Sequence, residues 1–135
     1  MGASALSDWI RFLADARALQ GIYGADIPSL HDVDLHEVSL HRDGPRATLR
    51  FDLATFPASP SAKWIAAGCN RVQLQLTAIV REVSISGWQA RCRIDLSIGR
   101  DGDALDLRAD NGTVKIALRA SALMLDKVSA YRDEG

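Results

Sequence analysis

Two runs of alternating apolar and polar residues within residues 72–98 constrain the fold more than any other part of the chain. Apolar residues occupy every second position of residues 72–78 and again of residues 88–98. A period of two places the two sets of side chains on opposite faces of a β-sheet. Because Ser86 and Gly87 separate the runs, we predict a long antiparallel hairpin with one face in the core and one in water. The core residues of its second strand would be Trp88, Ala90, Cys92, Ile94, Leu96 and Ile98.

An amphipathic helix is predicted before the first strand. Its apolar residues recur at helical spacing between Trp9 and Leu19, with Ser7 or Asp8 as the N-cap. Gly21 is expected to end it, because glycine tolerates the left-handed conformation of a helix C-terminus. The helix should lie across the sheet and cover part of its apolar face.

Further alternating runs predict the remaining strands and turns. The strands lie near residues 33–40, 47–53, 105–107, 114–118 and 123–131, with turns at residues 42–45, 100–103 and 110–112. The apolar phase changes near His36, which predicts a bulge there, and changes again between Leu125 and Val128. We therefore predict an α+β fold, in which the N-terminal helix packs on a mainly antiparallel sheet of about seven strands.

Length and composition are those of one soluble domain, which we expect to span residues 1–135. Hydrophobic residues make up 47% and charged residues 24% of the chain. No run approaches the roughly 18 apolar residues of a membrane span, and no signal peptide is visible. The only two cysteines, Cys69 and Cys92, fit a reducing compartment without a disulfide. We expect a cytoplasmic protein that does not act on membranes.

Charge is segregated along the chain although the net charge is only −1, which argues against a nucleic-acid binder. Residues 18–41 contain no Lys or Arg, while residues 42–93 are mainly basic. Such an acidic segment is a candidate for contact with a basic partner. Its carboxylates are Asp26, Asp32, Asp34 and Glu37.

Motifs that carry chemistry are scarce, and we expect no catalytic residues, no metal and no cofactor. The chain has no glycine-rich phosphate loop, no G-x-S-x-G, no C-x-x-C and no H-E-x-x-H. A metal site could be drawn from His31, Asp34 and His36, but solvated surface histidines explain the same residues. Trp88 is interpreted as a core anchor. Lys63 and Trp64, in the irregular segment 56–70, offer an alternative binding surface.

A series of landmarks along the chain resembles the immunity protein 50 family of bacterial polymorphic toxin systems, over about residues 6–131. Its opening landmarks are Trp9 with Leu13, Ile22-Tyr23-Gly24, Ile27-Pro28-Ser29-Leu30-His31, Arg42-Asp43-Gly44-Pro45 and Leu49-Arg50-Phe51-Asp52-Leu53. Those that follow are Pro57, Pro60, Lys63-Trp64, Asn70-Arg71-Val72-Gln73-Leu74, Ile85-Ser86-Gly87-Trp88 and Val128-Ser129-Ala130-Tyr131. Order and spacing carry the resemblance, since each motif alone is short.

The resemblance implies an immunity protein without enzymatic activity, which binds and neutralises a cognate toxin domain in the cytoplasm. It transfers no interface residues and does not identify the toxin or the oligomeric state. The residues alone also allow a small, mainly-β ligand-binding or structural domain, or an enzyme with a site in residues 56–70. For toxin binding we expect the acidic set Asp26, Asp32, Asp34 and Glu37, with Lys63 and Trp64 as the alternative surface.

Overall fold

The computed structural model describes residues 8–134, which form a mainly antiparallel sheet of six strands with few helices. The strands are β1 (Val33–His41), β2 (Arg46–Asp52), β3 (Arg71–Ser86), β4 (Arg93–Asp101), β5 (Ala104–Asp110) and β6 (Lys115–Tyr131). The helices are the 3₁₀ helix η1 (Asp8–Phe12), α2 (Arg17–Tyr23) and α3 (Ala62–Ala66). None of the described helices is long and apolar enough to cross a membrane.

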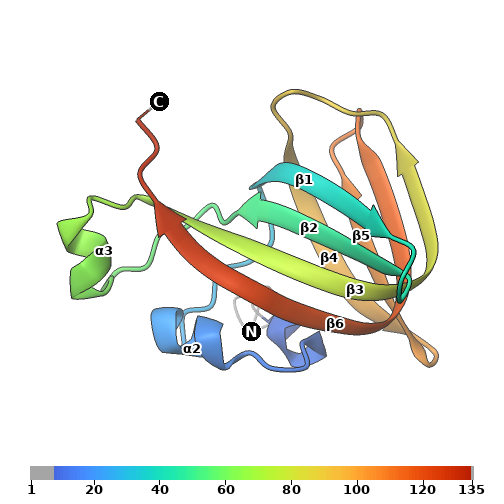
Figure 1. The fold of residues 1–135 in the computed structure, drawn as a ribbon, viewed down its shortest axis with the longest axis horizontal. Helices are drawn as coiled ribbons and strands as arrows, with labels where there is room; N and C mark the ends of the chain where they lie inside the picture. Colours follow the sequence, from blue (N-terminus) through green and yellow to red (C-terminus); the bar gives the residue numbers. More distant parts are fainter. Residues whose placement is uncertain (1–7, 135) are drawn as a thin grey trace.

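The sheet closes on itself in the order β1-β2-β3-β6-β5-β4, and β3 and β6 run together as its two longest strands (Figure 1). The predicted hairpin over residues 72–98 is therefore wrong. β3 pairs with β2 and β6, whereas β4 pairs with β5 and briefly with β1. β3 continues to Ser86 because its last residues find a partner in the first part of β6. The connection to β4 then runs across one end of the closed sheet (Figure 1).

Six strands form rather than seven because the two last predicted strands are one. The ladder between β3 and β6 shifts register where Gln75 is followed by Leu76 and where Ile79 is followed by Val80. These shifts leave Asp126 and Ser121 as extra residues on β6. A bulge reverses the phase of the side chains without ending the strand. The phase change predicted between Leu125 and Val128 is thus a bulge inside β6.

The predicted N-terminal helix is also wrong, since two short helices replace it. Between them Leu13 forms an isolated parallel bridge to Leu123, and the Ala14 N–H donates to the Leu123 carbonyl at 2.9 Å. The Asp15 carboxylate accepts from the Arg17 N–H at 3.0 Å, a local bond that competes with helix continuation. The second helix then ends at Gly24, with φ 62°, rather than at Gly21. The apolar stripe still faces the core, where Leu19 is completely buried.

The core follows the predicted alternation except in the segment before β4. Cys92, Ile94 and Leu96 are buried as predicted, but half of Trp88 is exposed and Ala90 is exposed. Trp88 lies in the connection between β3 and β4 and not in a strand, so period-two reasoning does not apply to it. The assignment of Trp88 to the core is wrong.

The predicted turns and the predicted bulge agree with the structure, unlike the predicted hairpin. The three turns at residues 42–45, 100–103 and 110–112 separate consecutive strands. The bulge predicted near His36 is confirmed by the register shift between Leu35 and Glu37. Within the irregular segment 56–70, the short helix α3 projects from one end of the molecule, near the C-terminus (Figure 1).

Candidate binding surface

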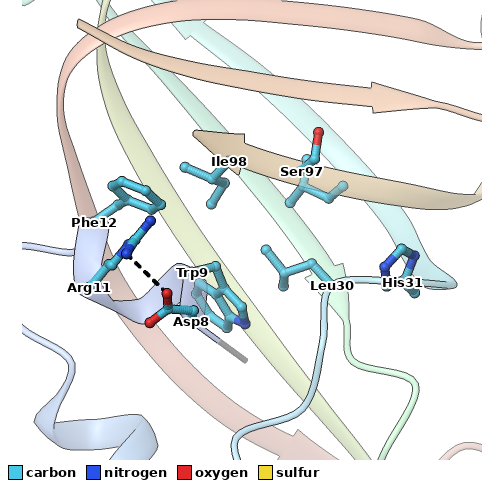
Figure 2. A pocket seen from close by; sticks show the side chains of 9 residues that line it. Asp8, Trp9, Arg11, Phe12, Leu30, His31, Ser97 and Ile98 are labelled. Atoms are coloured by element: carbon cyan, nitrogen blue, oxygen red, sulfur yellow. Dashed lines mark ion pairs between the residues drawn. The ribbon is translucent and has the colours of Figure 1, made fainter. Parts of the chain in front are cut away.

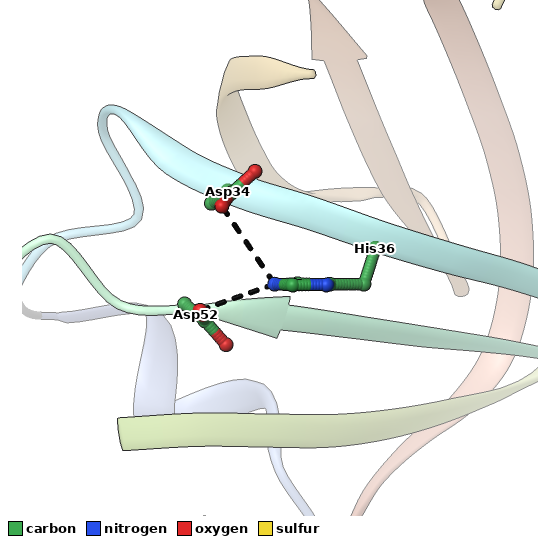
Figure 3. A group of neighbouring side chains, drawn as sticks. All are labelled: Asp34, His36 and Asp52. Carbon is green, nitrogen blue, oxygen red and sulfur yellow. Dashed lines mark hydrogen bonds and ion pairs between the residues drawn. The ribbon is translucent and has the colours of Figure 1, made fainter. Parts of the chain in front are cut away.

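Asp34, His36 and Asp52 gather where β1 and β2 lie side by side (Figure 3). Antiparallel register places Asp34 directly opposite Asp52. The bulge makes His36 the extra residue of β1, and its imidazole lies between the two carboxylates. His36 Nε2 is 3.1 Å from Asp52 Oδ2 and 3.7 Å from Asp34 Oδ2. Two like charges directly opposite on neighbouring strands repel, so this arrangement requires a compensating group between them.

Asp52 is the buried member of this cluster, with 2% of its surface exposed. Gln73 Nε2 donates to its Oδ1 at 2.9 Å, and the Tyr131 hydroxyl donates to its Oδ2. Burial, together with the bond to Asp52, raises the pKa of Tyr131 above its ordinary value. Donors from β3, β6 and the bulge of β1 thus hold this carboxylate in one orientation. A buried charge is tolerated when it is hydrogen-bonded in this way.

A polar cavity of about 470 Å³ opens beside the cluster. The half-exposed indole of Trp88 lies at this cavity, with residues from β1, the connection before β4 and the C-terminal segment. The lining residues are Asp34, Leu35, His36, Arg71, Trp88, Gln89, Ala90, Arg91, Arg93 and Asp133. We call this part of the surface the Trp88 face. Its combination of an exposed tryptophan with arginines is typical of protein contact sites.

The four carboxylates of the predicted acidic set are not equivalent. The Arg93 guanidinium donates two hydrogen bonds of 2.9 Å to the Asp32 carboxylate. This pairing lowers the pKa of Asp32 and raises that of Arg93. Glu37 is paired with Arg50 at 3.2 Å.

Asp34 belongs to the cluster, while Asp26 lies in the connection before β1 and makes no ion pair with the described residues. The structure therefore brings Asp34 to the Trp88 face, connects Asp32 to it through Arg93, and leaves Asp26 apart from it.

The alternative pair, Lys63 and Trp64, lies on α3. The Ser61 hydroxyl caps this helix by accepting from the Trp64 N–H at 3.2 Å. The Trp64 ring packs against Phe56, with 6.1 Å between ring centroids, and is half-buried. Lys63 is exposed, and 64% of Ile65 is exposed beside it. The Trp64 indole is thus partly covered by packing, and Lys63 and Ile65 form the exposed surface of α3.

A second pocket, of about 280 Å³, lies between η1 and β4 (Figure 2). The Arg11 guanidinium pairs with Asp8 at 3.0 Å and lies 4.8 Å from the centre of the Phe12 ring. The Trp9 indole N–H donates to the Pro28 carbonyl at 3.0 Å, which ties η1 to the connection before β1. His31 lines this pocket and faces Asp95 at 3.5 Å. The set His31, Asp34 and His36, drawn from the sequence, is therefore not brought together.

Prediction from the sequence did not identify two residues that organise the candidate surface. Asp52 completes the cluster but was not singled out among the carboxylates. A signal was present: the turn at residues 42–45 and the bulge near His36 together fix a register that places Asp52 opposite Asp34. Trp88 was placed in the core because the alternation was read as a strand from Trp88 onward, whereas β4 begins only at Arg93.

Comparison with known proteins finds one family. A family model described as Immunity protein 50 matches residues 15–131, which is most of the chain. No curated protein and no solved structure matches the chain.

Proposed function

Because the chain belongs to the immunity protein 50 family, we propose that it binds and neutralises a cognate bacterial toxin domain in the cytoplasm. The family match over residues 15–131 is the observation that carries this proposal. Residues 1–135 would act as a single domain and inhibit by protein–protein contact, without chemistry of their own.

We place the toxin contact on the Trp88 face. Trp and Arg are enriched among the residues that carry most of the binding energy at protein interfaces. Half of Trp88 is exposed and the fold does not need it as a core anchor, so a partner can bury a large apolar surface there. Arg91 and Arg93 flank it at the same cavity. A cavity of this kind accepts an acidic or aromatic side chain of a partner.

The acidic set contributes to this proposal through attraction of a basic toxin surface. Carboxylates steer a positively charged partner and raise its association rate. Arg93 and Arg50 compensate Asp32 and Glu37, which leaves Asp26 and Asp34 as the carboxylates without an arginine partner among the described residues. We therefore expect the acidic set to change association rates modestly and Trp88 to change dissociation.

The proposal is tested with a candidate toxin domain chosen from the genes that neighbour the gene of this chain. The two are co-expressed and co-purified, and binding kinetics are then measured for Trp88→Ala and for Ile65→Ala. Ile65 is the control, because it is a large apolar residue on α3 that is exposed at least as much as Trp88, 64% against 50%. We expect Trp88→Ala to weaken binding by about 2 kcal/mol or more, mainly through faster dissociation, and Ile65→Ala to leave it unchanged.

Two failures of this experiment are distinguishable. If the wild-type chain forms no complex and gives no protection against the toxin, the proposed function is wrong. If a complex forms but Trp88→Ala binds as well as wild type, only the choice of surface is wrong. A loss with Ile65→Ala alone would move the contact to α3 and its neighbour Lys63.

One observation favours a second function, a small-ligand site in the 470 Å³ cavity. Its volume falls within the range of ordinary ligand pockets. Such pockets are mostly apolar, however, and this one is lined mainly by charged and polar residues. The enzyme alternative in residues 56–70 is less favoured, because the hydroxyl of Ser61 is committed to capping α3.

A further inference from the structure

We propose that Asp34, His36 and Asp52 form a binding site for one divalent transition-metal ion, with Zn²⁺ as the best-fitting probe. The proposal concerns the chain alone and is independent of any toxin. From the sequence we expected no metal and interpreted the histidines as solvated surface residues, and the site proposed here departs from that expectation. His36 has a side chain that is only one-third exposed and that contacts a buried carboxylate.

The positions of the three ligand atoms carry the proposal. Nε2 of His36 and one carboxylate oxygen from each aspartate all lie within 4.8 Å of one another. A tetrahedral zinc site with bonds near 2.0–2.1 Å separates its ligand atoms by about 3.3 Å. The observed distances of 3.1 and 3.7 Å from Nε2 bracket that value. The Asp34 side chain is 37% exposed, and its rotation would close the remaining gap.

Of the two carboxylates in the cluster, Asp34 is the one that accepts no hydrogen bond from the described residues. The Nε2 atom of a neutral imidazole carries at most one proton, which serves the nearer carboxylate, Asp52. The contact to Asp34, at 3.7 Å, is too long for a hydrogen bond. Among the described residues Asp34 has no hydrogen-bond donor. A metal ion in place of the Nε2 proton would bind both carboxylates and the imidazole together.

The surroundings of the cluster are those of a supported metal site. Gln73 and Tyr131 donate to Asp52 from outside, as the hydrogen-bonding partners of metal ligands do. Of the three arginines at the adjoining cavity, Arg93 is paired with Asp32 and Arg71 with Asp133, which offsets their charge, while Arg91 has no ion pair among the described residues. The adjoining cavity gives an entry path and room for a water molecule as the fourth ligand.

The donor set selects the class of metal. One imidazole with two carboxylates suits Zn²⁺ and neighbouring transition metals. Ca²⁺ and Mg²⁺ prefer six or more ligands that are all oxygen, so an imidazole at the centre of the cluster disfavours them. We therefore expect selective binding of Zn²⁺ or Co²⁺ over Mg²⁺ and Ca²⁺.

Isothermal titration of the chelator-treated chain with ZnCl₂ tests the site. We expect one Zn²⁺ per chain, weakened by at least about 100-fold in His36→Ala and by about 10-fold or more in Asp34→Asn. His41→Ala is the matched control, since His41 is an exposed histidine on the same strand, outside the cluster. It should bind Zn²⁺ as the wild type does, and so should His31→Ala.

A second readout avoids dependence on the fold of any variant. Co²⁺ added to the wild-type chain should give the visible absorption of a tetrahedral site, and Zn²⁺ should abolish it. Circular dichroism of each variant shows whether a loss of binding reflects unfolding. Absence of one-site binding by the wild type would overturn the proposal, as would equal affinity in wild type and folded His36→Ala. Loss of binding in His31→Ala would also overturn it, by moving the site to Asp95.

Discussion

Asp52, at the end of β2, connects its own strand to three others through its side chain. Its carboxylate accepts hydrogen bonds from Gln73 on β3 and Tyr131 on β6, and it faces His36 on β1. Such a group contributes little while it is fully paired, but a missing partner leaves an uncompensated buried charge. The same carboxylate is central to the proposed metal site, so stability and binding are coupled at this position.

The two tyrosines give the structure a testable pH dependence. The Tyr131 hydroxyl donates to Asp52, and the Tyr23 hydroxyl donates to the Thr55 carbonyl at 2.7 Å. Burial raises the pKa of both phenols, and these are the only tyrosines of the chain. A phenol whose pKa is raised on folding stabilises the native state fully below the unfolded pKa, about 10. That contribution is lost as the pH rises from there toward the native pKa.

We therefore expect tyrosinate absorbance of the native chain to lag behind that of the urea-unfolded chain above pH 10. The urea midpoint of unfolding should fall over the same range. Tyr131→Phe should remove one of the two delayed ionisations. Native tyrosines that ionise at the same pH as the unfolded chain would show that the phenols are not buried as described.

At the scale of elements, the connection between β3 and β4 determines how the Trp88 face is built. It begins at Gly87, whose φ of 78° lies in the left-handed region. A Cβ at this position would lie 2.0 Å from the Thr113 carbonyl oxygen, in the turn before β6. Glycine is required here for two reasons, conformation and contact. Its close approach fixes where Trp88 leaves the sheet.

Gly87→Ala and Gly102→Ala separate these two requirements. Gly102 also has a positive φ, 64°, but a Cβ there meets no atom within 4 Å. Gly102→Ala should therefore cost about 1 kcal/mol, the strain of a left-handed alanine. Gly87→Ala should cost roughly 2–4 kcal/mol, because the Thr113 backbone must also move. Both values come from urea unfolding, and equal costs would show that the contact with Thr113 is unimportant.

At the scale of the whole molecule, the sequence determined the strands and turns but not their partners. Alternation and turn chemistry are local, so β1, β2 and the positions of the turns were predictable. The pairing of β3 with β6 joins residues far apart in the sequence, and no local pattern specifies it. The bulge at Ser121 resembles a strand end when only the phase is read, which divided β6 in two, whereas the bulge at Asp126 was visible as a phase change within the last predicted strand.

The same division between local and distant information applies to the candidate surface. Asp32, Asp34 and His36 were visible because they are close in sequence. Asp52 and Tyr131 join them only through the register of β1 with β2 and of β3 with β6. Trp88 lies at the surface because β4 begins only at Arg93, five residues after the start that the alternating pattern predicted.

The closure of the sheet is uneven, which predicts where the molecule opens first. β3 pairs with β6 from Arg71 to Ser86 and with β2 over residues 73–79, whereas β1 and β4 meet only at Val33 with Ile94 and Asp34 with Arg93. Two backbone bonds extend this seam, from the Leu35 N–H to Cys92 at 2.8 Å and from the Leu96 N–H to Leu30 at 2.9 Å. Segments with few paired neighbours open with lower free energy than the centre of a sheet.

Native-state hydrogen exchange should therefore divide the amides into two groups. The Leu35 and Leu96 amides are expected to exchange through local opening, with little dependence on urea. The amides of Leu74 and Leu76, buried at the centre of β3, should exchange only through global unfolding, with a steep dependence on urea. If the Leu35 and Leu76 amides exchange with the same free energy and the same urea dependence, the seam unfolds with the rest of the sheet. The argument from uneven pairing would then fail.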